Sequence, residues 1–236
     1  LHLVYVAWNR QVEAWRDDGG QTPDGELERT GGDADTRIAT YRYDGLGRRI
    51  RKLLGADPSE PDKALDYYYN ERWQVLEVRE DGDGDPRKQY VWDDVRYIDA
   101  PACRLYDGNL DGQLTLMSSD NVLYYQYDAN QNVTAVKDTL FGSVLEHYAY
   151  EAYGRPKMLH GAMDATWTST AASAWQERTQ NTFDNEVLFA GYRYDPETGL
   201  YHVRHRMYHP TLGRWGQRDP LQALDTRRLY LYSTSS

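Results

Sequence analysis

A unit made of an aromatic strand, a polar turn and a return strand recurs along the chain, and this repeat constrains the fold most. The clearest copy spans residues 39–54, ATYRYDGLGRRIRKLL, in which Asp44 to Gly47 separate two strand-like runs. Aspartate stabilises such a turn through its side chain, and glycine adopts the positive φ that tight turns need. Further copies read YYYNERWQVLEV (67–78), YYQYDANQNVTAV (124–136) and HYAYEAYGRPKML (147–159). The repeat predicts a series of antiparallel β-hairpins.

The spacing and composition of the repeats indicate a thin, curved β-array. Tyr43 and Tyr69 are 26 residues apart, and Tyr127 and Tyr150 are 23 apart. Periods of this size mark repeat architectures, in which each unit buries its apolar face against its neighbours. The chain has 21 Tyr and 7 Trp but only 3 Phe. Such aromatic rings carry a polar group and suit surfaces that are apolar on one side and wet on the other.

A second feature is the stretch 191–220, GYRYDPETGLYHVRHRMYHPTLGRWGQRDP. Turn-forming pairs such as Asp195-Pro196, Thr198-Gly199 and Leu212-Gly213 separate short runs with Tyr, Val and Trp, which predicts alternating strands and turns. Its pattern G-Y-x-Y-D-x-E-T-G-L-Y-x-x-R-x-R-x-Y-x-P-x-x-G-R-W-x-x-x-D-P closely resembles the core signature of RHS (YD-repeat) proteins. The resemblance implies an all-β fold of antiparallel hairpins that form part of a spiral β-shell.

The resemblance also implies a division of the chain. Residues 1–190 are interpreted as degenerate YD repeats and residues 191–236 as the RHS repeat-associated core segment, in one continuous β-array. The chain begins with Leu1 rather than Met. We therefore expect that this chain is a piece of a longer protein. We also expect that the chain stops before the position of the family's cleavage motif.

The first functional hypothesis from the resemblance is encapsulation. The chain would form the C-terminal part of a shell that holds a C-terminal effector, often a toxin, of a secreted or surface-delivered protein. Its partners would be its own upstream RHS repeats and the downstream effector region. From composition we expect the tyrosines to face inward and to offer the cargo both apolar and hydrogen-bonding contact.

The second hypothesis is an autoprocessing aspartyl endopeptidase. In the family, cleavage uses an Arg of an R-x-Y-x-P segment, the Asp of the next x-D-P, and a second Asp in a D-P-x-G-L motif. The matching residues are Arg206 and Asp219. Two carboxylates sharing a proton can activate water and donate a proton, and a nearby Arg can stabilise the developing oxyanion. Asp225 follows too closely and lacks the motif, so we expect half a site, inactive in this chain. The plain structural alternative is a turn and an ion-paired arginine.

A third hypothesis is a carbohydrate- or cell-surface-binding module, in which exposed aromatic rings stack on sugars. It predicts a cluster of Tyr and Trp on the outer face, whereas encapsulation places these residues inside. The position of the aromatic rings therefore discriminates between the two hypotheses.

Metal binding has one weak candidate. The segment DGNLDGQL places oxygen ligands at Asp107, Asn109 and Asp111, as at the start of a calcium loop. Position 12 is Ser118 rather than the bidentate glutamate, so an ordinary Asp/Gly hairpin turn is favoured. No other cofactor is expected. Within the stretch 191–220, His202, His205 and His209 lie close together in sequence, but they lack the further ligand that zinc needs.

Charge excludes other classes of function. The net charge is -10 and the pI is near 5.1, which disfavours nonspecific binding to nucleic acid or to anionic membranes. No apolar run approaches the roughly 20 residues that span a bilayer, so membrane insertion is not expected. Cys103 is the single cysteine; it excludes an intramolecular disulfide and is expected to be buried.

Overall fold

The computed structural model describes residues 1–6, 9–17, 35–93, 100–108, 121–138, 144–161, 175–178, 183–219 and 230. These residues form two antiparallel sheets and one 3-10 turn, η2 (Phe189–Gly191), with no α-helix among them. None of the described segments makes a helix that is long and apolar enough to cross a membrane. The all-β, antiparallel prediction is confirmed.

The first sheet has thirteen strands that follow one another in chain order, and we call it the wall. Its strands are β1 (His2–Tyr5), β2 (Gln11–Asp17), β3 (Asp35–Tyr43), β4 (Arg49–Leu54), β5 (Lys63–Tyr69), β6 (Val75–Glu80), β7 (Lys88–Trp92), β8 (Pro101–Tyr106), β9 (Asn121–Tyr127), β10 (Val133–Asp138), β11 (Val144–Tyr150), β12 (Pro156–Gly161) and β13 (Trp175–Arg178). The four repeats predicted from sequence are the hairpins β3–β4, β5–β6, β9–β10 and β11–β12.

The turns of these hairpins share one geometry. In the turn after β3, the Asp44 amide donates to the Arg48 carbonyl at 3.0 Å, and Asp44 Oδ1 accepts the amides of Leu46 and Arg48. Asn70 and Asp128 make the same side-chain contacts after β5 and β9. The predicted role of the turn carboxylate is confirmed.

The aromatic residue at the end of the first strand of a hairpin connects that hairpin to the preceding one. Its polar group donates to the carbonyl of the first residue of the preceding hairpin's return strand, at 2.6–2.8 Å. The pairs are Tyr43 to Gln11, Tyr69 to Arg49, Trp92 to Val75, Tyr127 to Pro101 and Tyr150 to Val133. Phenylalanine cannot make this bond, which explains why the repeats carry tyrosine.

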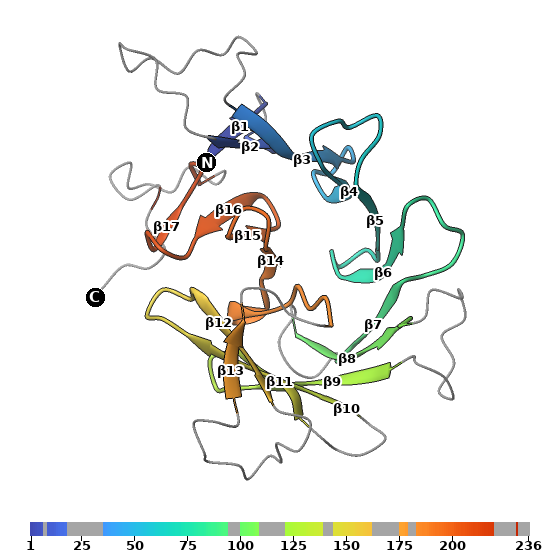
Figure 1. Cartoon of the computed structure of the whole chain (residues 1–236), viewed down its shortest axis with the longest axis vertical. Coiled ribbons are helices and arrows are strands. Elements are labelled where there is room, and N and C mark those ends of the chain that lie inside the picture. Colours follow the sequence, from blue (N-terminus) through green and yellow to red (C-terminus); the bar gives the residue numbers. More distant parts are fainter. Residues whose placement is uncertain are drawn as a thin grey trace.

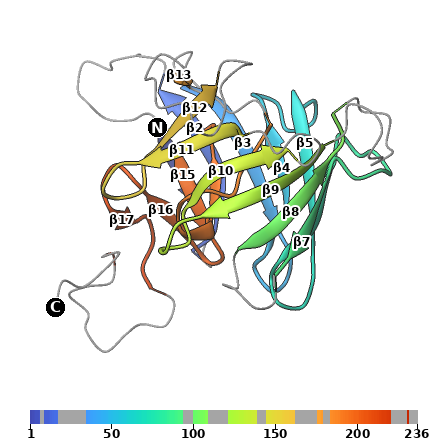
Figure 2. The same ribbon diagram turned by 90° about the horizontal axis from the view of Figure 1, so that it is seen from below.

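The second sheet consists of β14 (Arg193–Asp195), β15 (Leu200–Val203), β16 (Arg206–His209) and β17 (Arg214–Trp215). The wall curves around this C-terminal sheet, which lies on its concave side (Figures 1 and 2). The sequence predicted one continuous β-array, whereas the structure contains two separate sheets. After β13 the chain turns inward instead of adding another strand to the wall.

The main core fills the space between the two sheets. Wall residues such as Tyr67, Val78 and Tyr125 pack in one cluster with Tyr201 and Tyr208 of the C-terminal sheet. Cys103 is buried in the wall, as predicted. The core therefore depends on the C-terminal sheet being in place.

The turn after β11 anchors the C-terminal sheet. Tyr201 and Tyr208 donate to the carbonyls of Gly154 and Tyr153, each at 2.8 Å. Gly154 has φ +86, and a Cβ there would lie 2.5 Å from the Phe189 ring. Only glycine satisfies both the backbone and the close approach.

Candidate functional site

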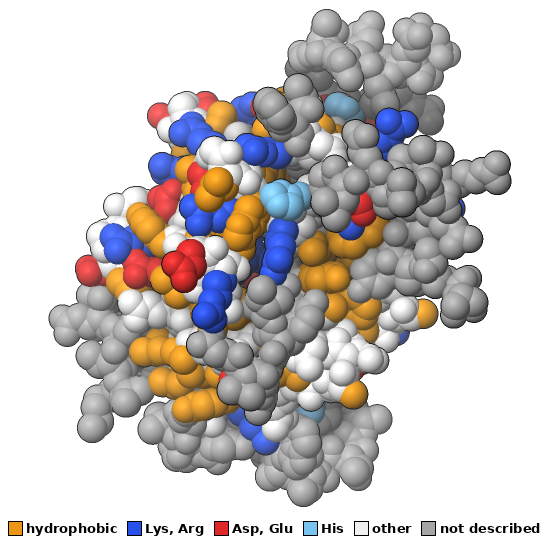
Figure 3. All heavy atoms as spheres, turned by 180° about the vertical axis from the view of Figure 1, so that it is seen from behind, with side chains coloured by type: hydrophobic (Ala, Val, Ile, Leu, Met, Phe, Trp, Pro, Cys, Tyr) orange, Lys and Arg blue, Asp and Glu red, His pale blue; other side chains and the backbone are white. Residues whose placement is uncertain are grey.

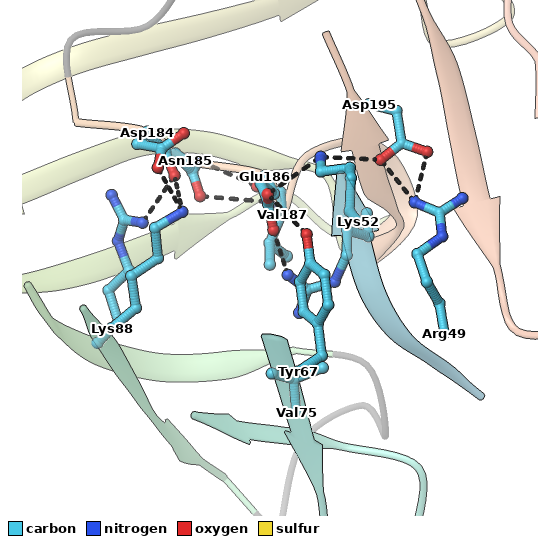
Figure 4. A network of polar contacts seen from close by, with 12 residues as sticks. Arg49, Lys52, Tyr67, Val75, Lys88, Asp184, Asn185, Glu186, Val187 and Asp195 are labelled. Atoms are coloured by element: carbon cyan, nitrogen blue, oxygen red, sulfur yellow. Dashed lines mark hydrogen bonds and ion pairs between the residues drawn. The ribbon is translucent and has the colours of Figure 1, made fainter. Parts of the chain in front are cut away.

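The contact between the wall and the segment that follows it contains a set of buried charges (Figure 4). We call residues 183–197, which include β14, the docking segment, because they run along the inner face of the wall. The wall contributes four buried cations, Arg49 and Lys52 of β4, Lys88 of β7 and Arg104 of β8. The partly exposed Lys63 of β5 also lies 3.7 Å from Asp184 Oδ2. The docking segment contributes three carboxylates whose side chains are at most 11% exposed, Glu186, Asp195 and Glu197, and Asp184, whose side chain is 35% exposed.

Arg49 and Asp195 form the most deeply buried of these pairs. Arg49 Nη1 donates to both carboxylate oxygens, at 2.8 and 2.7 Å, and the two side chains are 1% and 0% exposed. The guanidinium also lies 4.2 Å from the centre of the Tyr41 ring. Burial opposes the charge, but Asp195 holds the pKa of Arg49 well above its ordinary value. Removing one partner of such a buried pair strongly destabilises the protein, because the other charge stays buried without a partner.

Lys52 is shared among three carboxylates. Its Nζ lies 3.3 Å from Asp195 Oδ1, 3.5 Å from Glu186 Oε1 and 3.6 Å from Glu197 Oε2. Burial would lower the pKa of Lys52, but these carboxylates raise it well above the usual range. Burial raises the pKa of Glu197, whose Oε1 accepts the Tyr41 hydroxyl at 3.0 Å.

Lys88 and Arg104 hold the start of the docking segment. Lys88 Nζ lies 2.7 Å from Asp184 Oδ2, and both cations donate to the Asp184 carbonyl at 2.9 Å. Arg104 also donates to the Phe183 carbonyl. Burial would raise the pKa of Asp184, but the Lys88 charge lowers it below the ordinary value. The carboxylate is therefore ionised at neutral pH.

Glu186 lies at the centre of the site. It pairs with Arg193 and accepts the Tyr67 hydroxyl at 3.3 Å. Burial opposes its ionisation, but Lys88, Lys52 and Arg193 hold the pKa of Glu186 well below its usual range. These ion pairs hold residues 183–197 against strands that are distant in sequence. The arrangement therefore serves to bind the docking segment to the wall.

The sequence did not reveal this interface. Asp195 was interpreted as part of a turn, and it does accept the Thr198 and Gly199 amides there through its carbonyl. Its carboxylate, however, binds Arg49, 146 positions away. The available signal was the basic sequence of β4, which contains Arg49 and Lys52. A charge that a strand places inside the protein needs an acidic partner, because burying an unpaired charge is costly.

Arg206 and Asp219 come together as an ion pair. Arg206 Nη1 lies 3.0 Å from Asp219 Oδ2, with 20% and 27% of the side chains exposed. The Arg206 guanidinium stacks 3.9 Å from the centre of the Trp215 ring. Asp225 lies outside the described residues, and Asp195 is engaged by Arg49. The catalytic role of Arg206 and Asp219 stays a prediction.

The calcium candidate is only partly described. Asp107 is 3% exposed at the end of β8, whereas Asn109 and Asp111 lie outside the described residues. Within the part of the chain that the structure describes, no three His, Cys, Asp or Glu side chains are grouped to hold a metal ion. Calcium binding at this loop also stays a prediction.

Sequence comparison finds no matching family model but does find curated relatives. The chain is 30% identical over 187 residues to the "tRNA3(Ser)-specific nuclease WapA" of Bacillus spizizenii, and 29% identical over 187 residues to the "tRNA nuclease WapA" of Bacillus subtilis (strain 168). Each match covers 79% of this chain but only 6% of the relative. The chain thus spans a small part of these much longer proteins.

Structural comparison identifies the same architecture in TcdB2-TccC3. The crystal structure of TcdB2-TccC3 matches 93% of this chain and 10% of that chain, with a TM-score of 0.55 and 20% identity. The structure of TcdB2-TccC3 without its hypervariable C-terminal region matches 93% of this chain and 9% of that chain, with a TM-score of 0.54 and 19% identity. At this identity the likeness establishes the fold, an all-β antiparallel arrangement.

Proposed function

We propose that this chain is the closing part of an RHS-type (YD-repeat) β-shell, whose parent protein carries an effector further along the same polypeptide. The observation that carries the proposal is the buried ionic interface, which fastens the docking segment across the concave side of the wall. The curved sheet of hairpins would form the side of the shell, and the docking segment, bound across its concave face, would close the end of the shell.

The comparisons support this proposal at a coarser level. The WapA relatives are long proteins named as nucleases, and TcdB2-TccC3 has a hypervariable C-terminal region. We propose that the parent of this chain is likewise a secreted or surface protein with a variable C-terminal effector. We assign no nuclease activity to the 236 residues themselves, whose net charge of -10 offers little to a phosphate backbone.

The position of the tyrosines favours encapsulation over sugar binding. Many described tyrosines are buried between the sheets: Tyr41, Tyr67, Tyr90, Tyr125, Tyr148, Tyr201 and Tyr208. Four tyrosines of the described residues are exposed: Tyr153 in the turn after β11, Tyr230, and, on the wall strands, Tyr68 of β5 and Tyr124 of β9. Four strand spacings of about 4.8 Å separate these strands, roughly 19 Å in all, which is too far for one sugar ring.

The inner tyrosines also show what such a surface can bind. Tyr41, Tyr67 and Tyr125 donate hydroxyl hydrogen bonds to side chains of the docking segment, at 3.0–3.3 Å. In this chain the inner face therefore holds the chain's own C-terminal segment. We propose that further wall, built from upstream repeats, presents similar contacts to the effector.

The experiment uses the parent chain with its upstream repeats and about 100 downstream residues, the size of a small domain. Limited proteolysis of the wild type should leave the downstream region protected inside the shell. An Asp195→Asn variant should expose it, whereas a surface variant, Asp66→Asn, should not. Equal cleavage of the downstream region in the wild type and in the Asp195→Asn variant would overturn the proposal.

A second function, self-cleavage, is supported by the Arg206–Asp219 contact. In this proposal Asp219 shares a proton with an aspartate beyond Ser236; one carboxylate activates water while the other protonates the leaving amide. Arg206 stabilises the charge that develops on the carbonyl oxygen. Intact mass of the extended parent should show two fragments, and the Asp219→Asn variant one. A folded but uncut wild type would contradict self-cleavage and leave encapsulation standing.

A further inference from the structure

Tyr5 occupies the place in its hairpin that the connecting aromatic residues occupy in the later hairpins. The turn after β1 closes with the same backbone hydrogen bonds as the turn after β3: the Val6 amide donates to the Arg10 carbonyl at 3.0 Å, and the Asn9 amide donates to the Val6 carbonyl at 2.9 Å. Tyr5 directly precedes this turn, as Tyr43 precedes the turn after β3. The strands β1 and β2 therefore form a hairpin of the same kind.

Tyr5 differs from the later residues of this set, which we call the linking residues, because its hydroxyl has no partner. Each of the later linking residues donates to a backbone carbonyl of the preceding hairpin, at 2.6–2.8 Å. Among the described residues, the Tyr5 hydroxyl makes no hydrogen bond. Burial raises the pKa of Tyr5 to about 12, so the hydroxyl keeps its proton at neutral pH. The donor of a linking contact is therefore present without its acceptor.

The Tyr5 ring lies where a linking ring is expected. A Cβ on Gly216, which follows β17, would lie 3.3 Å from the Tyr5 hydroxyl oxygen. In a similar way, the centre of the Tyr43 ring lies 6.3 Å from that of the His202 ring on β15. Both tyrosines thus lie between the wall and the C-terminal sheet, which supports the equivalence of Tyr5 with the linking residues.

The two edges of the wall carry different side chains. Among the described strands β1 pairs only with β2, and its sequence HLVY contains no Asp, Glu, Lys, Arg or Pro. The apolar residues Leu1 and Val6, next to its two ends, are 57% and 43% exposed. The strand at the other edge, β13, instead presents the exposed residues Glu177 and Arg178. Charged side chains protect an edge strand against further pairing, so β1 is the edge that is able to accept another strand.

Exposed apolar side chains alone would not indicate a binding surface. On the back of the molecule, apolar side chains lie among Lys, Arg, Asp and Glu side chains (Figure 3). Single exposed apolar residues of this kind are normal on soluble proteins. The distinction of β1 is that an unpaired backbone edge and a linking tyrosine without its acceptor occur on the same strand.

We propose that β1 is the edge at which the wall accepts a further strand, and that this strand is the return strand of the preceding hairpin in the same polypeptide. It pairs with β1 through backbone hydrogen bonds. Tyr5 Oη donates to the backbone carbonyl of its first residue, as the later linking residues do. This inference rests on the proposed function, because it names the contact through which upstream repeats join this chain. Since the acceptor is a backbone group, the preceding repeat can vary in sequence.

The first test compares the 236-residue chain with the parent chain extended upstream by about 25 residues, the length of one repeat. In native-state hydrogen exchange, β1 should exchange at least about tenfold more slowly in the extended chain, because its outer amides become paired. The opposite edge, β13, should exchange as before. Unchanged exchange in β1 would overturn the proposal. An extended chain that protects β1 only as a dimer would also overturn it, because the partner would then be a second copy.

A variant tests the linking bond itself. In urea unfolding of the extended chain, Tyr5→Phe should lower the folding equilibrium constant about fivefold, whereas the 236-residue chain, which lacks the bond, should change little. Tyr150→Phe is the matched control, because its bond to the Val133 carbonyl is present in both chains and its effect should be the same in both. Equal effects of Tyr5→Phe in the two chains would overturn the proposal. The Asp195→Asn proteolysis test of encapsulation does not involve Tyr5, so either proposal can fail alone.

Discussion

The wall and the docking segment are held by different kinds of contact. Each wall strand pairs with the next in the chain, and one turn geometry and one aromatic–carbonyl bond recur from hairpin to hairpin. The docking segment instead binds through charges that lie far away in sequence, as in the Arg49–Asp195 pair. Repeating contacts allow a wall of any length, whereas the ionic contacts fit one segment at one place.

The largest expected effect is removal of the central carboxylate. Asp195→Asn leaves Arg49 buried without its partner, and we expect urea unfolding to show a loss of about 3–5 kcal/mol. The control is Asp66→Asn, which removes a wall pair 3.4 Å from Arg51 with 37% and 22% of the side chains exposed. Exposed pairs contribute at most about 1 kcal/mol. Equal losses in the two variants would show that the two regions do not differ.

The next effect tests the close approach at the anchoring turn. Gly154→Ala combines positive φ with a Cβ 2.5 Å from Phe189, whereas Gly82→Ala meets only the φ penalty, with no atom within 4 Å. We expect a loss of about 1–2 kcal/mol at Gly82 and clearly more at Gly154. Thermal or urea unfolding measures both. Similar losses would mean that Phe189 moves aside and that this contact is loose.

Acid should weaken the fold through its histidines: burial lowers the pKa of His147 in the wall and of His205 and His209 in the C-terminal sheet region, and lowers that of the buried His202 well below its ordinary value. The folded pKa of His202 lies below the ordinary 6.5, so the unfolded chain binds more protons and stability falls as pH drops below 6.5. Asp184 and Glu186, also lowered, add to the loss below about 4.5, while Glu197, raised, acts in the opposite direction.

The expected size is about 1.4 kcal/mol for each pH unit and each group. Urea unfolding at pH 7.5 and 5.5 measures it, and a His202→Gln variant should show a shallower dependence. A wild type equally stable at both pH values would contradict the buried, neutral state of His202.

The smallest effect belongs to the wall. Tyr150→Phe removes the hydroxyl that donates to the Val133 carbonyl at 2.6 Å, and we expect a loss of about 1 kcal/mol. Tyr68→Phe, at a residue 47% exposed, should change stability little. If Tyr150→Phe cost as much as Asp195→Asn, the wall would not be built from small, repeated contributions.

Local features of the fold were predictable from sequence, and long-range ones were not. The hairpins around residues 44, 70, 128 and 151 were predicted because turn residues act on their own neighbours. The strands β7, β8 and β13 escaped the pattern: in β7, Trp92 replaces the tyrosine, and β13 carries no turn signal of the repeat.

The candidate sites divide in the same way. The resemblance selected Arg206 and Asp219, and the structure brings them into contact. Nothing in the sequence pairs Arg49 with Asp195 or Lys88 with Asp184, because a charge pattern does not name its partner across such distances. The positive φ of Trp73 was missed too, because a bulky aromatic residue type does not indicate it.

Native-state hydrogen exchange tests most directly whether the docking segment closes the wall through its buried charges. In the wild type, the amides of β14–β16 should exchange as slowly as those of β9–β11, because both sheets share one core. In Asp195→Asn, exchange in β14–β16 should accelerate first, with β9–β11 still protected. Fast exchange of β14–β16 in the wild type, or an unchanged pattern in the variant, would contradict the account.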